Sequence, residues 1–343
     1  EGEYTFLDII HNMDKLENVL GISYKENNRI IHNPTRPLIE NLDEIPFPAR
    51  HLILDKEKYP PEAFGNLFAS RGCPYNCIYC ASHLVWTNKV RYRSPGNVIS
   101  EIKQINNFFK TQQFRFEDDS FTLDKKFVEN ICDSLIQEKI DIQWWCETRA
   151  NLVTDNLIKK MKQTGCEDMT IGVESGDEET LKKIKKGITI EQIRNASSIL
   201  KENKILFSAF FLIGFPWETK TEIDKTISLM KELDPYQAFL SVATPYPGTE
   251  LYDICISEGL IPERIDWSTF FHQSPDMYLN KNLKRDECDK IIKETELLFE
   301  KYNNKKRRGL LISSPLKTTK KIMKRGYFKP KALWALCQRY ILK

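Results

Sequence analysis

The chain has 343 residues, of which 41% are hydrophobic and 29% charged, with a net charge of +3. This composition fits a folded soluble protein with a large core, in one large domain or two smaller ones. No run of about 18 apolar residues occurs, which argues against a transmembrane helix. The nine cysteines are too few and too unevenly spread for a disulfide scaffold, so a reducing cytoplasm fits best.

The start of the chain is acidic and has neither a basic signal-peptide region nor an initiator Met. We therefore expect it to begin inside a longer protein or after processing. Residues 1–64 contain a hairpin pattern over 16–32 and then a proline-punctuated stretch, which predicts an extended entry segment.

From there the chain alternates short apolar runs with longer amphipathic ones. The predicted strands are 66–70, 113–118, 140–148, 168–174, 205–213 and 237–243. The predicted helices between them are 95–110, 125–138, 155–164, 191–203 and 221–233, with cap signals at Ser94, Thr154 and Thr189 and a closing Gly165. Six strands alternating with five helices predict a parallel α/β architecture.

Three cysteines, Cys73, Cys77 and Cys80, lie at C-x3-C-x2-C spacing on a loop that follows the first predicted strand. Three thiolates on one short loop can converge on one iron–sulfur cluster and leave one iron open to another molecule. The alternatives are a zinc site that takes His83 as its fourth ligand, or three free thiols. The other cysteines are scattered and are predicted to be small buried hydrophobes, so no second cluster is expected.

Polar or turn-forming residues follow each of the later predicted strands, where parallel α/β sheets place their chemistry. These groups are 117–119, Arg149, 174–176, 214–216 and 245–249. Because the carboxyl ends of parallel strands meet at one edge of a sheet, we expect these residues to surround a single site with the cysteine loop.

The run Arg71-Gly-Cys-Pro-Tyr-Asn-Cys-Ile-Tyr-Cys80 resembles the cluster loop of radical S-adenosylmethionine (SAM) enzymes. More specifically, the chain resembles the subgroup that carries an N-terminal cobalamin-binding domain. Five later motifs, in the family's order, support this resemblance: Phe-Glu-Asp-Asp-Ser-Phe-Thr at 116–122, Trp-Cys-Glu-Thr-Arg at 145–149, Ile-Gly-Val-Glu-Ser-Gly at 171–176, Phe-Leu-Ile-Gly-Phe-Pro-Trp-Glu-Thr at 211–219 and Pro-Tyr-Pro-Gly-Thr at 245–249.

The resemblance implies a partial (β/α)6 TIM-like barrel, with an N-terminal linker segment and a helical, basic C-terminal extension. The implied domains are a linker over 1–64 that follows a missing cobalamin-binding domain, a radical SAM core over 65–255 and a C-terminal helical region with a basic tail over 256–343.

The resemblance also implies the site. Cys73, Cys77 and Cys80 would hold a 4Fe–4S cluster, and SAM would chelate its open iron. Asp118 and Asp119 would meet the SAM ammonium, and Arg149 its carboxylate or a substrate anion. Glu174 would contact the ribose. Gly214 would let the backbone approach the adenine closely, and Ile213 would pack on the adenine ring. Tyr79 would act mainly through its backbone.

The implied activity is reductive cleavage of SAM to a 5′-deoxyadenosyl radical, followed in the full-length protein by cobalamin-dependent methyl transfer to a substrate carbon. A radical cyclase, oxidase or rearrangement enzyme without methyl transfer stays open, as does an RNA-modifying enzyme. A non-catalytic iron–sulfur protein is disfavoured because it would not need the ordered polar strand ends. The implied partners are a small-molecule or lipid-like substrate and a one-electron donor such as a flavodoxin or ferredoxin.

The last 43 residues carry 14 Lys or Arg and no Asp or Glu, so the preceding 300 residues carry a net charge of −11. This basic tail is compatible with a solvated surface, with a membrane or lipid contact, or with a nucleic-acid contact. A nucleic-acid partner is disfavoured because no added RNA-binding domain is visible. The expected location is the cytoplasm, with membrane association left open.

Overall fold

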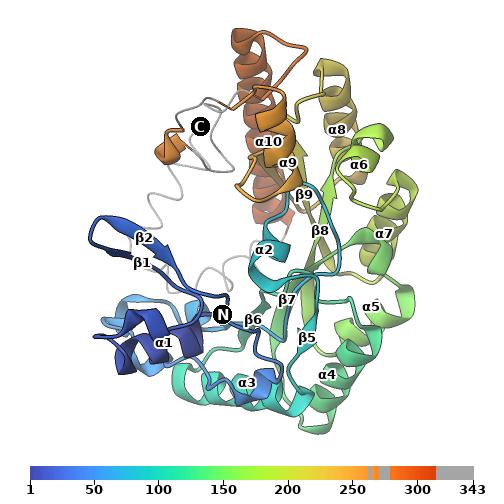
Figure 1. The fold of residues 1–343 in the computed structure, drawn as a ribbon. Helices are drawn as coiled ribbons and strands as arrows, with labels where there is room; N and C mark the ends of the chain where they lie inside the picture. Colours follow the sequence, from blue (N-terminus) through green and yellow to red (C-terminus); the bar gives the residue numbers. More distant parts are fainter. Residues whose placement is uncertain (262–264, 270–278, 314–343) are drawn as a thin grey trace.

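The computed structural model describes residues 1–261, 265–269 and 279–313 and contains a six-stranded parallel sheet (Figure 1). The strand order is β10-β9-β8-β7-β6-β3, so strands adjacent along the chain are adjacent in the sheet. The strands are β3 (Asn66–Leu67), β6 (Gln113–Phe116), β7 (Gln143–Thr148), β8 (Cys166–Glu174), β9 (Leu206–Ile213) and β10 (Gln237–Val242). The end strands β3 and β10 do not pair with each other, and the sheet is therefore an open, partial barrel.

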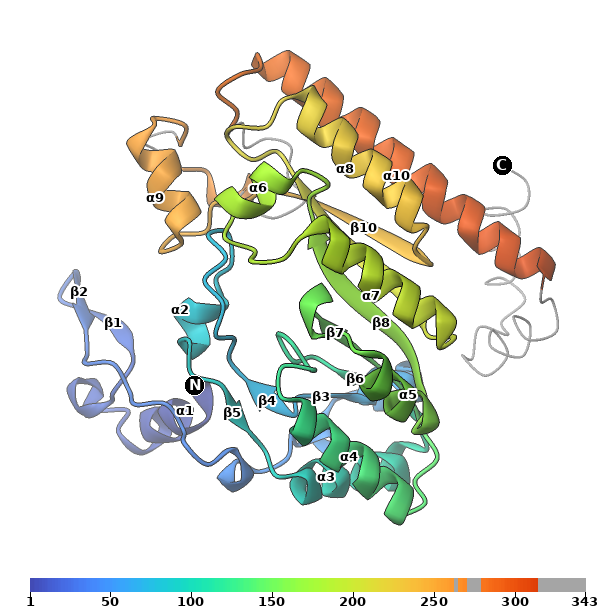
Figure 2. The ribbon, with the colours of Figure 1, turned by 90° about the vertical axis from the view of Figure 1, so that its right-hand side faces the viewer.

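Helices connect the strands, and most of them lie along the outer side of the sheet (Figure 2). The connecting helices are α3 (Pro95–Phe109), α4 (Lys125–Gln137), α5 (Asp155–Gln163), α6 (Glu178–Lys183), α7 (Ile190–Glu202) and α8 (Lys220–Leu233), and α9 (Glu250–Ser257) follows the last strand. The long α10 (Arg285–Ser313) runs beside α8 and contacts β10. The predicted α/β partial barrel is confirmed.

The helices begin where the sequence supplies capping side chains. The Ser94 hydroxyl accepts from the Asn97 N–H, and Thr189 and Thr219 each form a reciprocal capping box with the residue three positions on. Thr154, by contrast, makes no side-chain cap bond. Gly165 ends the α5 turn at φ +91°, and a side chain there would collide with the Ile142 carbonyl.

Each strand sends alternate side chains to opposite faces of the sheet. On β7, Trp144 and Cys146 are buried in the main core between sheet and helices. Trp145 and Glu147 therefore point to the concave face, where Glu147 bonds Arg115 of β6. The concave face thus carries the polar side chains, and the helix-covered face is almost wholly apolar.

The first predicted strand is shorter than expected. After β3 the chain leaves the sheet, and β4 (Ser70–Arg71) pairs instead with β5 (Arg91–Tyr92) in a two-stranded antiparallel ribbon. The carboxylate of Asp118 accepts the backbone N–H groups of Ala69 and Ser70, which removes these donors from the sheet. This ribbon carries the cysteine loop.

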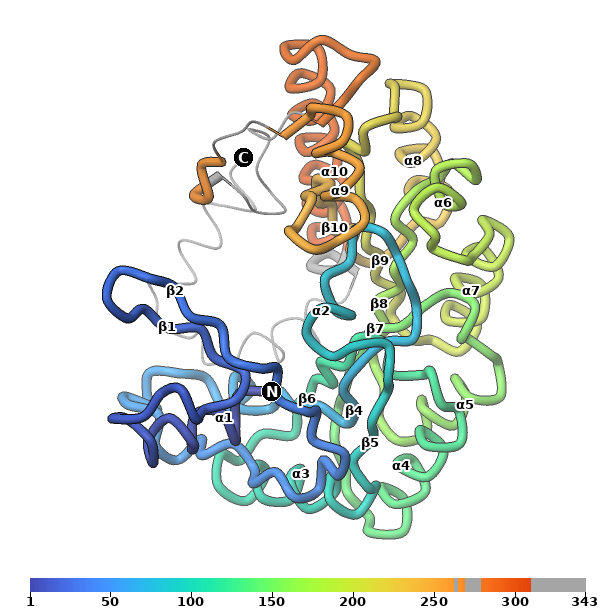
Figure 3. Tube along the Cα trace, viewed as in Figure 1, coloured from blue at the N-terminus to red at the C-terminus, as the bar shows by residue number. Residues whose placement is uncertain are grey.

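Residues before β3 form the short helix α1 (Gly2–His11), the hairpin β1 (Ser23–Glu26) with β2 (Arg29–His32), and several 3-10 turns. The hairpin is confirmed, whereas α1 was not predicted. This blue segment of Figure 3 lies beside the β3 end of the sheet. It is anchored by the Glu1 carboxylate, which bonds Arg71 at 3.0 Å and Arg91 at 2.7 Å.

Within the described residues, the helical character predicted for the C-terminal extension is confirmed by α10 (Arg285–Ser313). Most of the basic tail lies outside the described residues, so its three interpretations stay predictions. Within the described residues, no helix is both long enough and apolar enough to span a membrane.

Candidate active site

The cysteine loop lies at the carboxyl edge of the sheet, between β4 and the short helix α2 (Ser82–Trp86). Gly72 opens it at φ +103°, where a Cβ atom would stand 2.4 Å from the Lys89 carbonyl oxygen. Only glycine fits this close approach of two chain segments.

The middle of the loop is fixed by backbone bonds from distant segments. The Ile78 N–H donates to the Ile184 carbonyl at 3.1 Å, and the Ile78 carbonyl accepts from the Leu251 N–H at 2.9 Å. Ile78 itself is buried in the main core. The loop is thereby tied to the segments that follow β8 and β10, which brings opposite ends of the sheet together around the cysteines.

Two of the three cysteine sulfurs have an N–H donor. Cys80 accepts from the Ser82 backbone at 3.5 Å, and Cys77 accepts from the Arg149 guanidinium at 3.6 Å. None of the three forms a disulfide. Burial raises the pKa of the Cys73 and Cys80 thiols and so opposes their ionisation.

Donors that already point at two of the sulfurs suit thiolates bound to iron, because N–H···S bonds stabilise iron–sulfur thiolates. Within the described residues, no three His, Cys, Asp or Glu side chains are arranged to hold one metal ion, and this includes the three loop cysteines. A zinc site with His83 as its fourth ligand stays an alternative prediction.

Arg149 follows β7 and is almost fully buried, at 5% exposure. Its Nη2 donates to the Lys186 carbonyl, and its guanidinium lies 3.6 Å from the centroid of the Tyr75 ring. Its Nη1 is directed at the Cys77 sulfur and its Nε has no hydrogen-bond partner. The two terminal nitrogens predicted to bind a ligand carboxylate therefore contact the cysteine loop and the protein backbone in this structure.

Glu174 ends β8 in a left-handed conformation at φ +65°. Its carboxylate forms a 2.6 Å ion pair with Lys186, and both side chains are largely buried, at 12% and 6% exposure. Gly172 makes room for the pair, because a Cβ there would lie 2.7 Å from both charged groups. The Lys186 ammonium also lies 3.4 Å from the Tyr79 hydroxyl.

A cavity of about 210 Å³ opens beside this ion pair. Its walls come from the cysteine loop and from the ends of β8, β9 and β10, and are formed by Tyr79, Glu174, Phe210, Phe211, Leu212, Ser241, Val242, Thr244 and Tyr246. Burial, together with the Glu174 carboxylate, raises the pKa of Tyr79, which keeps its hydroxyl protonated. The cavity is apolar along β9 and polar at its rim, a composition suited to a nucleoside.

The side chain of Ile213 is placed differently from the prediction. It is fully buried with Ile291 and Ile292 of α10, on the outer face of the sheet. Its neighbour Leu212 lines the cavity instead, because side chains alternate along a strand. The prediction that the Ile213 side chain packs on a ligand ring is therefore wrong.

Gly214 follows at φ +87° and donates its N–H to the buried Glu218 carboxylate at 2.7 Å. Glu218 also accepts the Phe215 N–H and so holds the strand end, whereas Glu222 caps α8. Glu218 therefore fixes the turn at Gly214.

The two predicted aspartates are separated by the structure. Asp118 is 2% exposed, and both of its carboxylate oxygens accept backbone N–H bonds from Ala69 and Ser70 at the base of the loop. Asp119 is exposed and accepts the Ser82 hydroxyl at 2.8 Å. Asp119 is thus the more accessible of the two to a ligand beside the cysteines.

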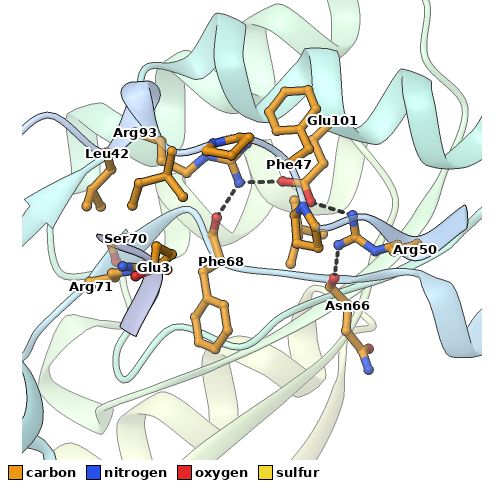
Figure 4. A pocket seen from close by; sticks show the side chains of 14 residues that line it. Glu3, Leu42, Phe47, Arg50, Asn66, Phe68, Ser70, Arg71, Arg93 and Glu101 are labelled. Carbon is orange, nitrogen blue, oxygen red and sulfur yellow. Dashed lines mark hydrogen bonds and ion pairs between the residues drawn. The ribbon is translucent and has the colours of Figure 1, made fainter. Parts of the chain in front are cut away.

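A larger cavity of about 410 Å³ lies between the N-terminal segment and β3 (Figure 4). Its polar groups satisfy one another: Glu101 pairs with Arg50 and Arg93, and these donate to the Asn66 and Phe68 carbonyls. None of the three loop cysteines lines it. We attribute this cavity to packing of the entry segment against the sheet edge.

Sequence reasoning missed Lys186, Ser82 and Tyr75. Lys186 lies in the run Lys182-Lys-Ile-Lys-Lys186, which reads as a solvated basic surface, and its neighbour Lys185 is indeed exposed. The only signal was Gly187, whose positive φ turns the chain and directs Lys186 inward.

The comparisons with known proteins agree with this geometry. The family model of the radical SAM superfamily matches residues 67–230. The uncharacterized methyltransferase PH0819 of Pyrococcus horikoshii is 36% identical over 303 residues, which cover 87% of this chain and 66% of that protein. An anaerobic magnesium-protoporphyrin IX monomethyl ester cyclase of Rubrivivax gelatinosus is 29% identical, over 74% of this chain and 47% of the cyclase.

Among solved structures, the apo form of the cobalamin-dependent SAM radical enzyme OxsB superposes with a TM-score of 0.67 at 18% identity. The match covers 98% of this chain and 58% of OxsB, and at this identity it shows a shared fold. The chain thus spans between about half and two thirds of the curated relatives quoted above. Motifs, fold and family match agree, and the chain belongs to the radical SAM superfamily, whose members use a 4Fe–4S cluster and SAM.

Proposed function

We propose that Cys73, Cys77 and Cys80 hold the 4Fe–4S cluster and that SAM binds between this loop and the 210 Å³ cavity. The carrying observation is that three free cysteines lie on one loop and that two of their sulfurs accept an N–H bond. When bound and reduced, the cluster supplies the electron that cleaves SAM to a 5′-deoxyadenosyl radical.

The surrounding residues bind and orient SAM in this proposal. Asp119 lies beside the cysteine loop and accepts the SAM ammonium, with Asp118 fixing the base of the loop. Glu174, held by Lys186, accepts from the ribose hydroxyls, and the Gly214 turn and Leu212 border the adenine. The apolar cavity wall excludes water from the reacting atoms.

Anaerobic reconstitution tests the cluster assignment. The wild-type chain is expected to bind about four irons and to form 5′-deoxyadenosine from SAM with dithionite. Cys77→Ala removes one ligand and is expected to abolish this cleavage, whereas Cys288→Ala, a buried cysteine of α10, is the matched control and keeps it. Two or fewer irons in the wild-type chain, or cleavage retained without Cys77, contradicts the assignment.

We further propose that the complete protein is a cobalamin-dependent methyltransferase in which residues 1–64 link a preceding cobalamin-binding domain to the barrel. The 36% identity to a protein named a methyltransferase and the fold shared with a cobalamin-dependent enzyme support this proposal. The substrate is a small molecule, the electron donor a flavodoxin or ferredoxin, and the location the cytoplasm.

A radical cyclase is the second candidate, favoured by the 29% identity to the protoporphyrin ester cyclase. The absorption spectrum of the protein purified from its complete gene separates the two. Bound cobalamin together with transfer of the SAM methyl carbon to product supports the methyltransferase. Product that carries no methyl from SAM supports the cyclase.

A further inference from the structure

Arg149 is a buried cation without a carboxylate partner. Its side chain is 5% exposed, yet within the described part of the chain no Asp or Glu lies within ion-pair distance of it. The neighbouring arginines Arg71, Arg91 and Arg115 all have such partners. A buried charge of this kind is costly unless an anion compensates it.

The anion that fits lies at the cysteine loop. The Arg149 Nη1 is 3.6 Å from the Cys77 sulfur. The Lys186 carbonyl and the Tyr75 ring hold the guanidinium in this position from two other sides. Three thiolates on a cluster would supply the negative charge that the fold otherwise lacks here.

The donor to Cys77 differs in kind from the donor to Cys80. Cys80 accepts a neutral backbone N–H from the residue two positions later. Cys77 accepts from a charged side chain that comes from the end of β7, 72 residues away in sequence. A charge-assisted bond at one sulfur is the stronger electrostatic influence, and such bonds set cluster potentials.

We propose that Arg149 acts through Cys77 to raise the reduction potential of the cluster. This inference rests on the proposed cluster assignment. One electron enters from an external low-potential donor, no bond forms or breaks in that step, and the added negative charge is stabilised by the nearby fixed positive charge. Arg149 then makes the cluster easier to reduce than the loop alone would.

The test is an anaerobic potentiometric measurement of the reconstituted chain by electron paramagnetic resonance, without SAM. Arg149→Gln removes the charge, and we expect at least a tenfold shift of the equilibrium toward the oxidised cluster, which is about 59 mV more negative for one electron. Arg149→Lys keeps a positive charge on a differently shaped side chain, and we expect it to shift the reduction potential by less. Arg194→Gln, which removes an exposed paired arginine on α7, is the control and keeps the wild-type potential.

Iron content separates the failure of this inference from failure of the cluster assignment. If wild type and Arg149→Gln both hold about four irons and share one potential, the inference is overturned. If the SAM affinity falls in the same variant and the potential does not change, Arg149 binds the SAM carboxylate instead, and the inference is overturned. If Arg149→Gln cannot hold the cluster, Tyr75→Leu decides, because it removes the ring that holds the guanidinium beside Cys77. A wild-type potential in Tyr75→Leu then overturns the inference.

Discussion

Glu218 is the buried carboxyl that fixes the turn at Gly214. Its Oε2 accepts two backbone N–H bonds, its Oε1 has no partner, and burial raises its pKa to about 8. The folded chain therefore holds this proton up to about pH 8, while the unfolded chain releases it near 4.5. Because folding takes up a proton in this window, Glu218 lowers the free energy of unfolding as pH rises across it.

We expect Glu218→Gln to flatten this pH dependence. Urea unfolding at pH 5.5 and pH 8.5 measures it, and the wild-type chain should lose more stability between the two than the variant. Glu222→Gln is the control, because the pKa of Glu222 is lowered and its contribution changes only at more acidic pH. Equal losses in wild type and Glu218→Gln would contradict the prediction.

At the scale of elements, the cysteine loop depends on the close contact between the β4 and β5 ends. Gly72→Ala would push a Cβ atom against the Lys89 carbonyl at a positive φ. We expect the variant to fold but to hold well under half of the wild-type iron, because the cysteines move apart. Iron analysis after reconstitution checks this.

Gly96→Ala is the matched control, since the same added methyl at the start of α3 meets no atom within 4 Å. It should load iron like the wild-type chain. Full iron loading in Gly72→Ala would show that the loop can shift to accommodate the side chain.

The strands of the sheet and the helices between them were largely predictable, because several of these helices have capping residues and the strands have a period-2 or continuous apolar pattern. The predicted site residues at the strand ends also gather at one edge of the sheet. What the sequence could not show depends on long-range pairing. Asp118 diverts the chain after β3, and Lys186 turns inward to Glu174, through contacts 48 and 12 residues apart.

The face of the sheet to which a side chain points was the least predictable feature. Ile213 lies in a fully apolar run, where both faces are buried and alternation gives no clue to which face meets the cavity. Arg149 was correctly placed at a strand end, yet its hydrogen-bond partners, a sulfur and a backbone carbonyl, carry no sequence signature.

At the scale of the whole molecule, one carboxylate joins the entry segment to the barrel. Glu1 is buried between Arg71, which precedes the cysteine loop, and Arg91 of β5, whose Nη1 also donates to the Ile39 carbonyl. A movement of the entry segment is therefore transmitted through Glu1 to the ribbon that carries the cysteines.

Arg91→Met removes the Arg91 donor from the Ile39 carbonyl and one of the two guanidinium donors from Glu1 Oε1. We expect a loss of about 2 kcal/mol in the free energy of unfolding and faster proteolysis within residues 1–64. Arg194→Met, which breaks an exposed pair, should cost less than about 1 kcal/mol. Denaturant unfolding and limited proteolysis measure both, and equal stability of the two variants would show that the anchor contributes little.

The short cysteine loop has a consequence for the order of assembly. All three thiols lie within one loop, so closing them around iron costs little chain entropy, whereas bringing Arg149 to Cys77 closes a separation of 72 residues. On the proposed cluster assignment, a nascent or partly unfolded chain would capture iron before the barrel closes. The positive charge of Arg149 would arrive only with the complete sheet, so the centre would mature in two stages: the loop first binds iron, and the folded barrel then sets the reduction potential.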